Sequence, residues 1–186
     1  MKSKFISFEG LSGVGKSTIS KLLAEKIGAG LVGTIPQKFG DLRKVFDHSE
    51  ATSINARFLF YLAAVLEGGK SIEEVLSAGK NVVVESYLYR TIAFHRGMGS
   101  NLDIFLPSDV LLPDVVFHLV CEEVERQRRR KVRKKHETHW DRLAEQNAER
   151  ILREYGRFEM NILDTTRLQP EEVVEKLIGL LNEARG

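Results

Sequence analysis

Cysteine and long apolar segments are scarce in this sequence. Its one cysteine, Cys121, excludes an intramolecular disulfide. No segment approaches the roughly 20 consecutive apolar residues that a membrane-spanning helix needs. The N-terminus also lacks the apolar stretch and cleavage site of a secretory signal. We therefore expect a cytoplasmic protein that does not associate with membranes.

An excess of charge of one sign is also missing. The 28 Lys and Arg residues nearly balance the 26 Asp and Glu residues, which leaves a formal net charge of +2. Overall charge therefore gives no reason to expect binding to nucleic acid or to a membrane surface. We expect no nucleic-acid partner, and any anionic ligand must be recognised locally.

The length and the pattern of apolar residues indicate the fold class. A chain of 186 residues suffices for one sizeable core, and no repeat or low-complexity linker divides it, so we predict a single domain over residues 1–186. Short apolar runs that are typical of buried strands alternate with segments of helical periodicity. This alternation predicts an α/β fold with a parallel sheet and helices on both faces. The apolar runs are 5–8, 82–84, 115–120 and 161–164, and the helical patterns are 19–27, 58–66 and 170–181.

A glycine-rich segment follows the first predicted strand. Residues 10–17, Gly-Leu-Ser-Gly-Val-Gly-Lys-Ser, match the pattern G-x-x-x-x-G-K-[ST]. Its glycines let the backbone wrap a phosphate, while the amides and the helix N-terminus supply partial positive charge. Lys16 reaches the β- and γ-phosphates, and the Ser17 hydroxyl can ligate magnesium. The motif predicts a three-layer P-loop NTPase fold with ATP and Mg2+ as cofactors, bound by Gly10, Ser12, Gly13, Val14, Gly15, Lys16, Ser17 and Thr18.

A carboxylate ends a later predicted strand. Glu85 directly follows the apolar run 82–84, and the carboxyl ends of parallel strands are where such sheets bind ligands. We expect Glu85 to face Lys16 and Ser17, where it could hold magnesium through water or accept a proton from an attacking hydroxyl. A glutamate that only caps the following turn is the alternative. Neither a D-x-x-G nor an N-K-x-D segment occurs, which favours a kinase over a GTPase switch.

The order and spacing of these segments resemble the thymidylate kinase family, with the deoxynucleoside kinases as more distant relatives. Residues 5–18 look like the opening strand and P-loop, and residues 85–95 like the segment that begins with Asp-Arg-Tyr in that family. Residues 140–143 are similar to the end of its lid, and residues 163–166 to the segment beside the adenine. The resemblance implies a five-stranded parallel sheet and ATP-dependent phosphorylation of a nucleoside monophosphate, and it implies a possible homodimer.

Four acceptor-side groups of that family are absent. Ser12 replaces an aspartate, Thr34 an arginine, Ala64 the arginine that reads the base, and Ser86 the arginine that grips the acceptor phosphate. Alanine cannot replace the bidentate bonds of arginine, so the acceptor is the open question. One alternative is a kinase of nucleosides or other small alcohols, because deoxynucleoside kinases carry a glutamate at the position of Glu85. Another is a non-catalytic nucleotide-binding regulator.

Other side chains are available to bind the acceptor. Arg43 follows the loop after the second strand, Arg57 opens a helix, and Arg90 lies three residues beyond Tyr87. Each arginine could equally be an ordinary exposed residue, and each aromatic ring could belong to the core or stack on a base. The predicted acceptor-binding set is Arg43, Arg57, Tyr61, Tyr87, Arg90 and Phe94.

A strongly basic stretch runs from Arg126 to Lys135. Such a run is typical of a solvated helix face or of nucleic-acid binding. The resemblance instead implies the mobile lid of a kinase, whose arginines neutralise the transferring phosphoryl group. We predict a lid at approximately residues 126–145, with Arg128, Arg129 and Arg142 joining Lys16 and Glu85 as catalytic residues.

Overall fold

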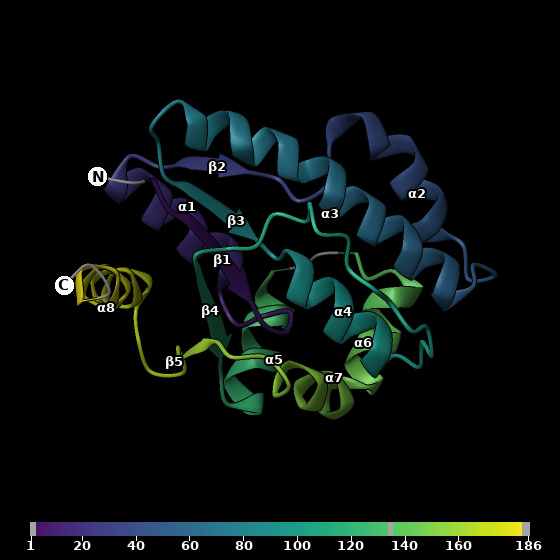
Figure 1. Ribbon diagram of the computed structural model, residues 1–186. Helices are drawn as coiled ribbons and strands as arrows, with labels where there is room; N and C mark the ends of the chain where they lie inside the picture. Colours follow the sequence, from purple (N-terminus) through teal and green to yellow (C-terminus); the bar gives the residue numbers. More distant parts are fainter. Residues whose placement is uncertain (1–2, 134–135, 184–186) are drawn as a thin grey trace.

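The computed structural model describes residues 3–133 and 136–183, which form a parallel sheet with helices on both sides (Figure 1). The five strands have the order β2-β3-β1-β4-β5, and all four neighbouring pairs are parallel. The α/β fold with a five-stranded parallel sheet that the sequence predicts is therefore confirmed. The strands are β1 (Phe5–Glu9), β2 (Gly30–Val32), β3 (Val82–Glu85), β4 (Val115–Val120) and β5 (Asn161–Asp164).

Eight α-helices and a short 3-10 helix connect or flank these strands in the described part of the chain. Helix α1 follows the glycine-rich segment and ends at Gly28, whose φ of 63° is the left-handed conformation that commonly terminates a helix. The last helix opens with Pro170, which suits a first helical position because it has no backbone N–H. The helices are α1 (Lys16–Ile27), η1 (Gln37–Phe39), α2 (Gly40–His48), α3 (Ile54–Ser77), α4 (Leu88–Gly97), α5 (Glu123–Val132), α6 (His139–Gln146), α7 (Ala148–Tyr155) and α8 (Pro170–Glu183).

The two faces of the sheet bury different residues because side chains alternate along a strand. One cluster contains Phe8 and Val83 together with Leu23 of α1 and Leu177 of α8. A second cluster contains Phe5, Val82 and Val84 with the apolar face of α3. Within the described residues, no helix is long and apolar enough to cross a membrane.

The register of the central strands brings the ends of β1 and β3 together. Phe8 is paired with Glu85, and the next residue, Glu9, is paired with His118 of β4. The P-loop therefore begins beside the carboxyl ends of β3 and β4, which is the edge where parallel sheets bind ligands.

Candidate active site

The P-loop connects β1 to α1 through three glycines with positive φ. Gly10, Gly13 and Gly15 have φ values of 133°, 96° and 103°. A Cβ on Gly10 would lie 2.4 Å from the carbonyl oxygen of Leu119, and a Cβ on Gly13 would lie 2.8 Å from that of Arg126. Only glycine fits these two positions. The loop is thus packed against β4 and α5 while its other side borders a cavity.

Lys16 is folded back onto the loop. Its Nζ donates hydrogen bonds of 2.8 Å to the carbonyl oxygens of both Gly10 and Leu11, and the side chain is buried. Burial, helped by the charge of Arg90, lowers the pKa of Lys16 to about 7, although Glu85 and Glu9 oppose the shift. A bound anion would therefore find a lysine whose charge is poorly compensated.

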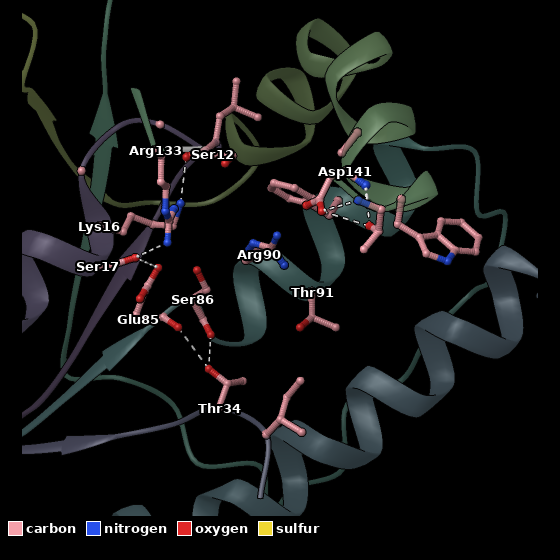
Figure 2. A pocket seen from close by; sticks show the side chains of 18 of the residues that line it. Ser12, Lys16, Ser17, Thr34, Glu85, Ser86, Arg90, Thr91, Arg133 and Asp141 are labelled. Carbon is pink, nitrogen blue, oxygen red and sulfur yellow. Dashed lines mark hydrogen bonds between the residues drawn. The ribbon is translucent and has the colours of Figure 1, made fainter. Parts of the chain in front are cut away.

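Ser17 and Glu85 meet across the end of the sheet (Figure 2). The Ser17 hydroxyl donates a 2.6 Å hydrogen bond to Oε1 of Glu85. A guanidinium nitrogen of Arg133, at the end of α5, lies 3.5 Å from the same hydroxyl. A hydroxyl and a carboxylate are oxygen ligands of the kind that magnesium prefers, and this ion commonly takes one or two protein ligands and completes its shell with phosphates and water. The pair therefore fits a magnesium ion.

A cavity of about 1000 Å³ extends from the P-loop to α3. It brings together most of the residues that the sequence predicts for the site. Those that line it are Ser12, Gly13, Gly15, Lys16, Ser17, Thr18, Arg43, Arg57, Tyr61, Glu85, Arg90, Phe94 and Arg129.

Arg57 forms a buried cluster at the α3 end of the cavity. Its guanidinium donates to Asp47 at 2.8 Å and lies 4.5 Å and 4.8 Å from the ring centroids of Tyr61 and Trp140. Burial raises the pKa of Asp47, but the charge of Arg57 and hydrogen bonds from Tyr61 and the two arginines outweigh it, so the pKa is lowered. Neither Asp47 nor Trp140 is a site residue that the sequence predicts, because only the packing of α2 and α6 against α3 brings them to Arg57.

His95 completes this cluster from α4. Its Nδ1 lies 2.6 Å from the carbonyl oxygen of Thr91, and its Nε2 lies 2.9 Å from Nη1 of Arg57. Burial first, and then the charge of Arg57, lower the pKa of His95 to about 3. We therefore assign a neutral ring that donates from Nδ1 and accepts at Nε2.

Arg90 projects into the middle of the cavity, between the P-loop end and Asp141 (Figure 2). Its guanidinium lies 3.9 Å from the centroid of the Phe94 ring. Among the described residues, no carboxylate forms an ion pair with it. Ser86, four residues before Arg90, also lines the cavity. Because its side chain is small, it leaves room for the guanidinium of Arg90.

The comparisons with known proteins agree with this architecture. The family model described as thymidylate kinase matches residues 8–178. The chain belongs to the thymidylate kinase family. A probable thymidylate kinase of Methanocaldococcus jannaschii is 30% identical over 95% of both chains. A thymidylate kinase of Leptospira borgpetersenii is 28% identical over 96% of this chain and 93% of its own.

Two solved structures share the fold. The thymidylate kinase of Candida albicans matches with a TM-score of 0.81 and 18% identity, over 99% of this chain and 93% of its own. The thymidylate kinase of Ehrlichia chaffeensis matches with a TM-score of 0.67 and 20% identity, over 98% of this chain and 100% of its own. The P-loop NTPase fold that the sequence predicts is thereby confirmed.

Five predicted site residues of this thymidylate kinase-family chain do not line the cavity. Gly10 and Val14 contribute from behind it: the Gly10 amide donates to the Tyr155 hydroxyl, and the Val14 carbonyl accepts from Thr165. Tyr87 is a correction to the predicted acceptor-binding set, because its ring is fully buried in the core. The Tyr87 hydroxyl donates to the carbonyl of Val65. The other two are Arg128 and Arg142.

The phase of α5 decides which arginines of the basic stretch face the site. Arg126 is 2% exposed and donates to the carbonyl oxygen of Ser12 at 2.9 Å. Arg129 and Arg133 lie three and seven residues further on, hence on the same face. Arg129 donates to Thr165, and both line the cavity. Arg133 is not among the site residues that the sequence predicts. The helical spacing of seven residues from Arg126 is the signal that could have identified it.

Arg128 and Arg142 are corrections in placement within the predicted lid. Arg128 points outward on α5, where it pairs with Glu125 and its side chain is 66% exposed. Arg142 donates to Glu50 and to the backbone of Glu137 rather than into the cavity. The lid segment itself, 126–145, includes residues 134–135, which lie outside the described residues.

Proposed function

We propose that this member of the thymidylate kinase family transfers the γ-phosphoryl group of ATP to a nucleoside monophosphate with the help of magnesium. The observation that carries the proposal is the cavity that joins the P-loop, the Ser17–Glu85 pair and Arg90. It has a phosphate cradle, oxygen ligands for a cation and a cationic side chain further in. Thymidylate, on which the named relatives act, is the first acceptor to test.

The donor end would work through charge and position. Lys16 would exchange the carbonyls of Gly10 and Leu11 for the β- and γ-phosphates of ATP. Ser17 would ligate magnesium directly and Glu85 through water, and the bound ion would neutralise the phosphate oxygens. Arg133 reaches the Ser17 hydroxyl and is therefore placed to stabilise charge on the transferring group.

The acceptor end divides its arginines between two tasks. Arg90 has no carboxylate ion-pair partner among the described residues, so its charge is available for the acceptor phosphate, and it stands in for the arginine missing at Ser86. Asp47 balances the charge of Arg57, which makes that cluster a suitable wall for the nucleoside. Helix α4 connects Arg90 to the Arg57 cluster. His95, which contacts Arg57, follows Arg90 by five residues, about 7.5 Å along the helix.

This division favours a monophosphate over the nucleoside or small-alcohol alternative, since a neutral acceptor would leave Arg90 without an anion. A purely regulatory role would not require the part of the cavity that lies beyond the P-loop, around Arg90.

We also propose a homodimer in the cytoplasm. The exposed residues Leu59 and Leu66, seven positions apart on α3, give an apolar stripe suited to a second copy. Sedimentation of the parent and of Leu59→Glu tests the dimer.

The test of the function is product analysis with ATP, magnesium and a panel of nucleoside monophosphates, nucleosides and small alcohols. The proposal expects a nucleoside diphosphate and ADP in equal amounts, loss of both in Lys16→Ala, and lower amounts of both in Glu85→Gln at limiting magnesium. A nucleoside monophosphate formed from a nucleoside as the main product would favour the runner-up. ATP binding without turnover of any compound would favour the regulatory role.

A further inference from the structure

Glu9 is a buried carboxyl group that the mechanism above does not use. It is the last residue of β1, directly before the P-loop, and it is 0% exposed. Its Oε1 accepts hydrogen bonds of 3.0 Å from the Ser7 hydroxyl and from the backbone N–H of Tyr87, while Oε2 is buried without a partner. Burial raises the pKa of Glu9 to about 7, despite the opposing hydrogen bonds and the charges of Lys16 and Arg90. Such a group is costly to bury, so its place directly before the P-loop needs a reason.

The turn that Glu9 contacts is strained. Ser86 has a φ of 66°, the one positive value at a non-glycine residue among the described residues. A left-handed residue that is not glycine is strained, and this conformation persists only where its surroundings hold it. The β1–β3 pairing ends at Phe8 and Glu85, so the buried amide of Tyr87 lies beyond the reach of the strand ladder.

Three side-chain or backbone contacts hold this turn. The carbonyl of Phe8 accepts from the Ser86 amide at 2.8 Å, which is the last bond of the ladder. The Thr34 hydroxyl donates to the carbonyls of Ser86 and Glu85. Glu9 supplies the third contact, to Tyr87. Of the three, it is the contact that holds the backbone amide of the residue immediately before α4.

The turn lies between two residues of the proposed site, Glu85 and Arg90. Glu85 precedes it and must point to Ser17, whereas α4 follows it and carries Arg90 into the cavity. A change in the turn would move the magnesium-side carboxylate and the acceptor-side arginine relative to each other. Phosphoryl transfer depends on that distance because the attacking and leaving oxygens must be in line.

We propose that Glu9 is a positioning residue: its carboxyl group ties the end of β1 to the start of α4 and so holds Glu85 and Arg90 in the arrangement that phosphoryl transfer requires. This inference rests on the proposed function. The properties that matter in this proposal are the length of the Glu9 side chain and its acceptor oxygen, not its charge.

Two variants separate reach from charge. Glu9→Gln keeps the length and a carbonyl oxygen that accepts from Tyr87, so kcat should stay within about 3-fold of the parent. Glu9→Asp keeps the acid but is shorter by one methylene, so the bond to Tyr87 is lost and kcat should fall about 100-fold. The affinity for ATP should change little in either, since the P-loop backbone is untouched. Ser7→Ala is the matched control, because it removes the other bond to the same oxygen and should leave kcat unchanged.

Hydrogen exchange of the Tyr87 amide, followed by NMR, gives a readout that does not depend on turnover. The amide should be protected in the parent and in Glu9→Gln, and exposed in Glu9→Asp. The proposal is overturned if Glu9→Asp loses this protection but keeps its kcat, or if a folded Glu9→Gln loses as much activity as Glu9→Asp. A parent that phosphorylates no nucleoside monophosphate would instead refute the proposed function, while the exchange data would still show whether Glu9 holds the turn.

Discussion

The Ser17 hydroxyl donates a 2.6 Å hydrogen bond to the Glu85 carboxylate, which joins the first turn of α1 to the end of β3. The two residues are 68 positions apart, and each belongs to an element whose end faces the cavity. Their contact indicates where a magnesium ion would sit between the protein and the phosphates of ATP.

Removing the carboxylate should weaken magnesium binding. In Glu85→Gln, the magnesium concentration that half-saturates the kinase at fixed ATP should rise about 10- to 100-fold, as for other groups that hold a metal through water. Titration of activity with magnesium measures this change. A variant with the parental magnesium dependence would show that Glu85 only caps the turn.

Arg90 should bind the acceptor phosphate. Arg90→Ala should raise the KM for the monophosphate about 10- to 100-fold, because a charge-assisted bond is lost, with little change in the KM for ATP. Arg96, on the same helix but outside the cavity lining, gives the matched control Arg96→Ala. Equal effects of the two substitutions would contradict the assignment of Arg90.

Arg133 and Arg128 make opposite predictions for α5. Arg133→Ala should lower kcat about 100-fold if this arginine stabilises the transferring group. Arg128→Ala removes an exposed pair with Glu125, and such pairs contribute little, so its kcat should change less than about 2-fold. Steady-state kinetics of both variants decide between the structural placement and the sequence prediction, which named Arg128. A larger loss in Arg128→Ala would favour the sequence prediction.

ATP binding should be accompanied by proton uptake at Lys16. The pKa of this lysine is lowered to about 7, so at pH 8 much of it is neutral until phosphates favour the charged form. The pKa of Lys16 is also lower in the folded protein than in the unfolded chain. The free energy of unfolding should therefore decrease as the pH falls from 10.5 through 7. Calorimetry at pH 8 in buffers of different ionisation enthalpy should report uptake of up to one proton, absent in Lys16→Met. Buffer-independent heats in the parent would refute this.

His118 should make the protein sensitive to acid. Burial, together with the charge of Lys16, lowers its pKa from 6.5 to about 4. A depressed histidine pKa gives stability that is present above pH 6.5 and is lost as the pH falls through 4, here on the order of 3 kcal/mol. His118→Phe keeps a ring against Tyr155, so its unfolding free energy should fall less between pH 6.5 and 4 than that of the parent. Parallel denaturant titrations at these pH values measure the difference, and equal slopes would contradict it.

The sequence by itself determined the donor end of the site. The P-loop is contiguous, and its function depends on local backbone conformations that three glycines and a following helix impose, so the pattern of residues 10–17 suffices to predict it. The alternation of apolar runs and helical segments determined the parallel sheet, and Glu85 could be placed because it ends a strand. These inferences need only local conformation and the rule that parallel strands align their ends.

Only the tertiary structure decided the acceptor end. Asp47, Arg57, His95 and Trp140 come from α2, α3, α4 and α6, and their meeting depends on how these helices pack, which no local pattern encodes. The phase of α5 decided that Arg133 rather than Arg128 faces the site, because one buried contact of Arg126 fixes the rotation of the whole helix. Tyr87 went to the core for a similar reason: the strained turn at Ser86, tied by Glu9, directs its ring inward.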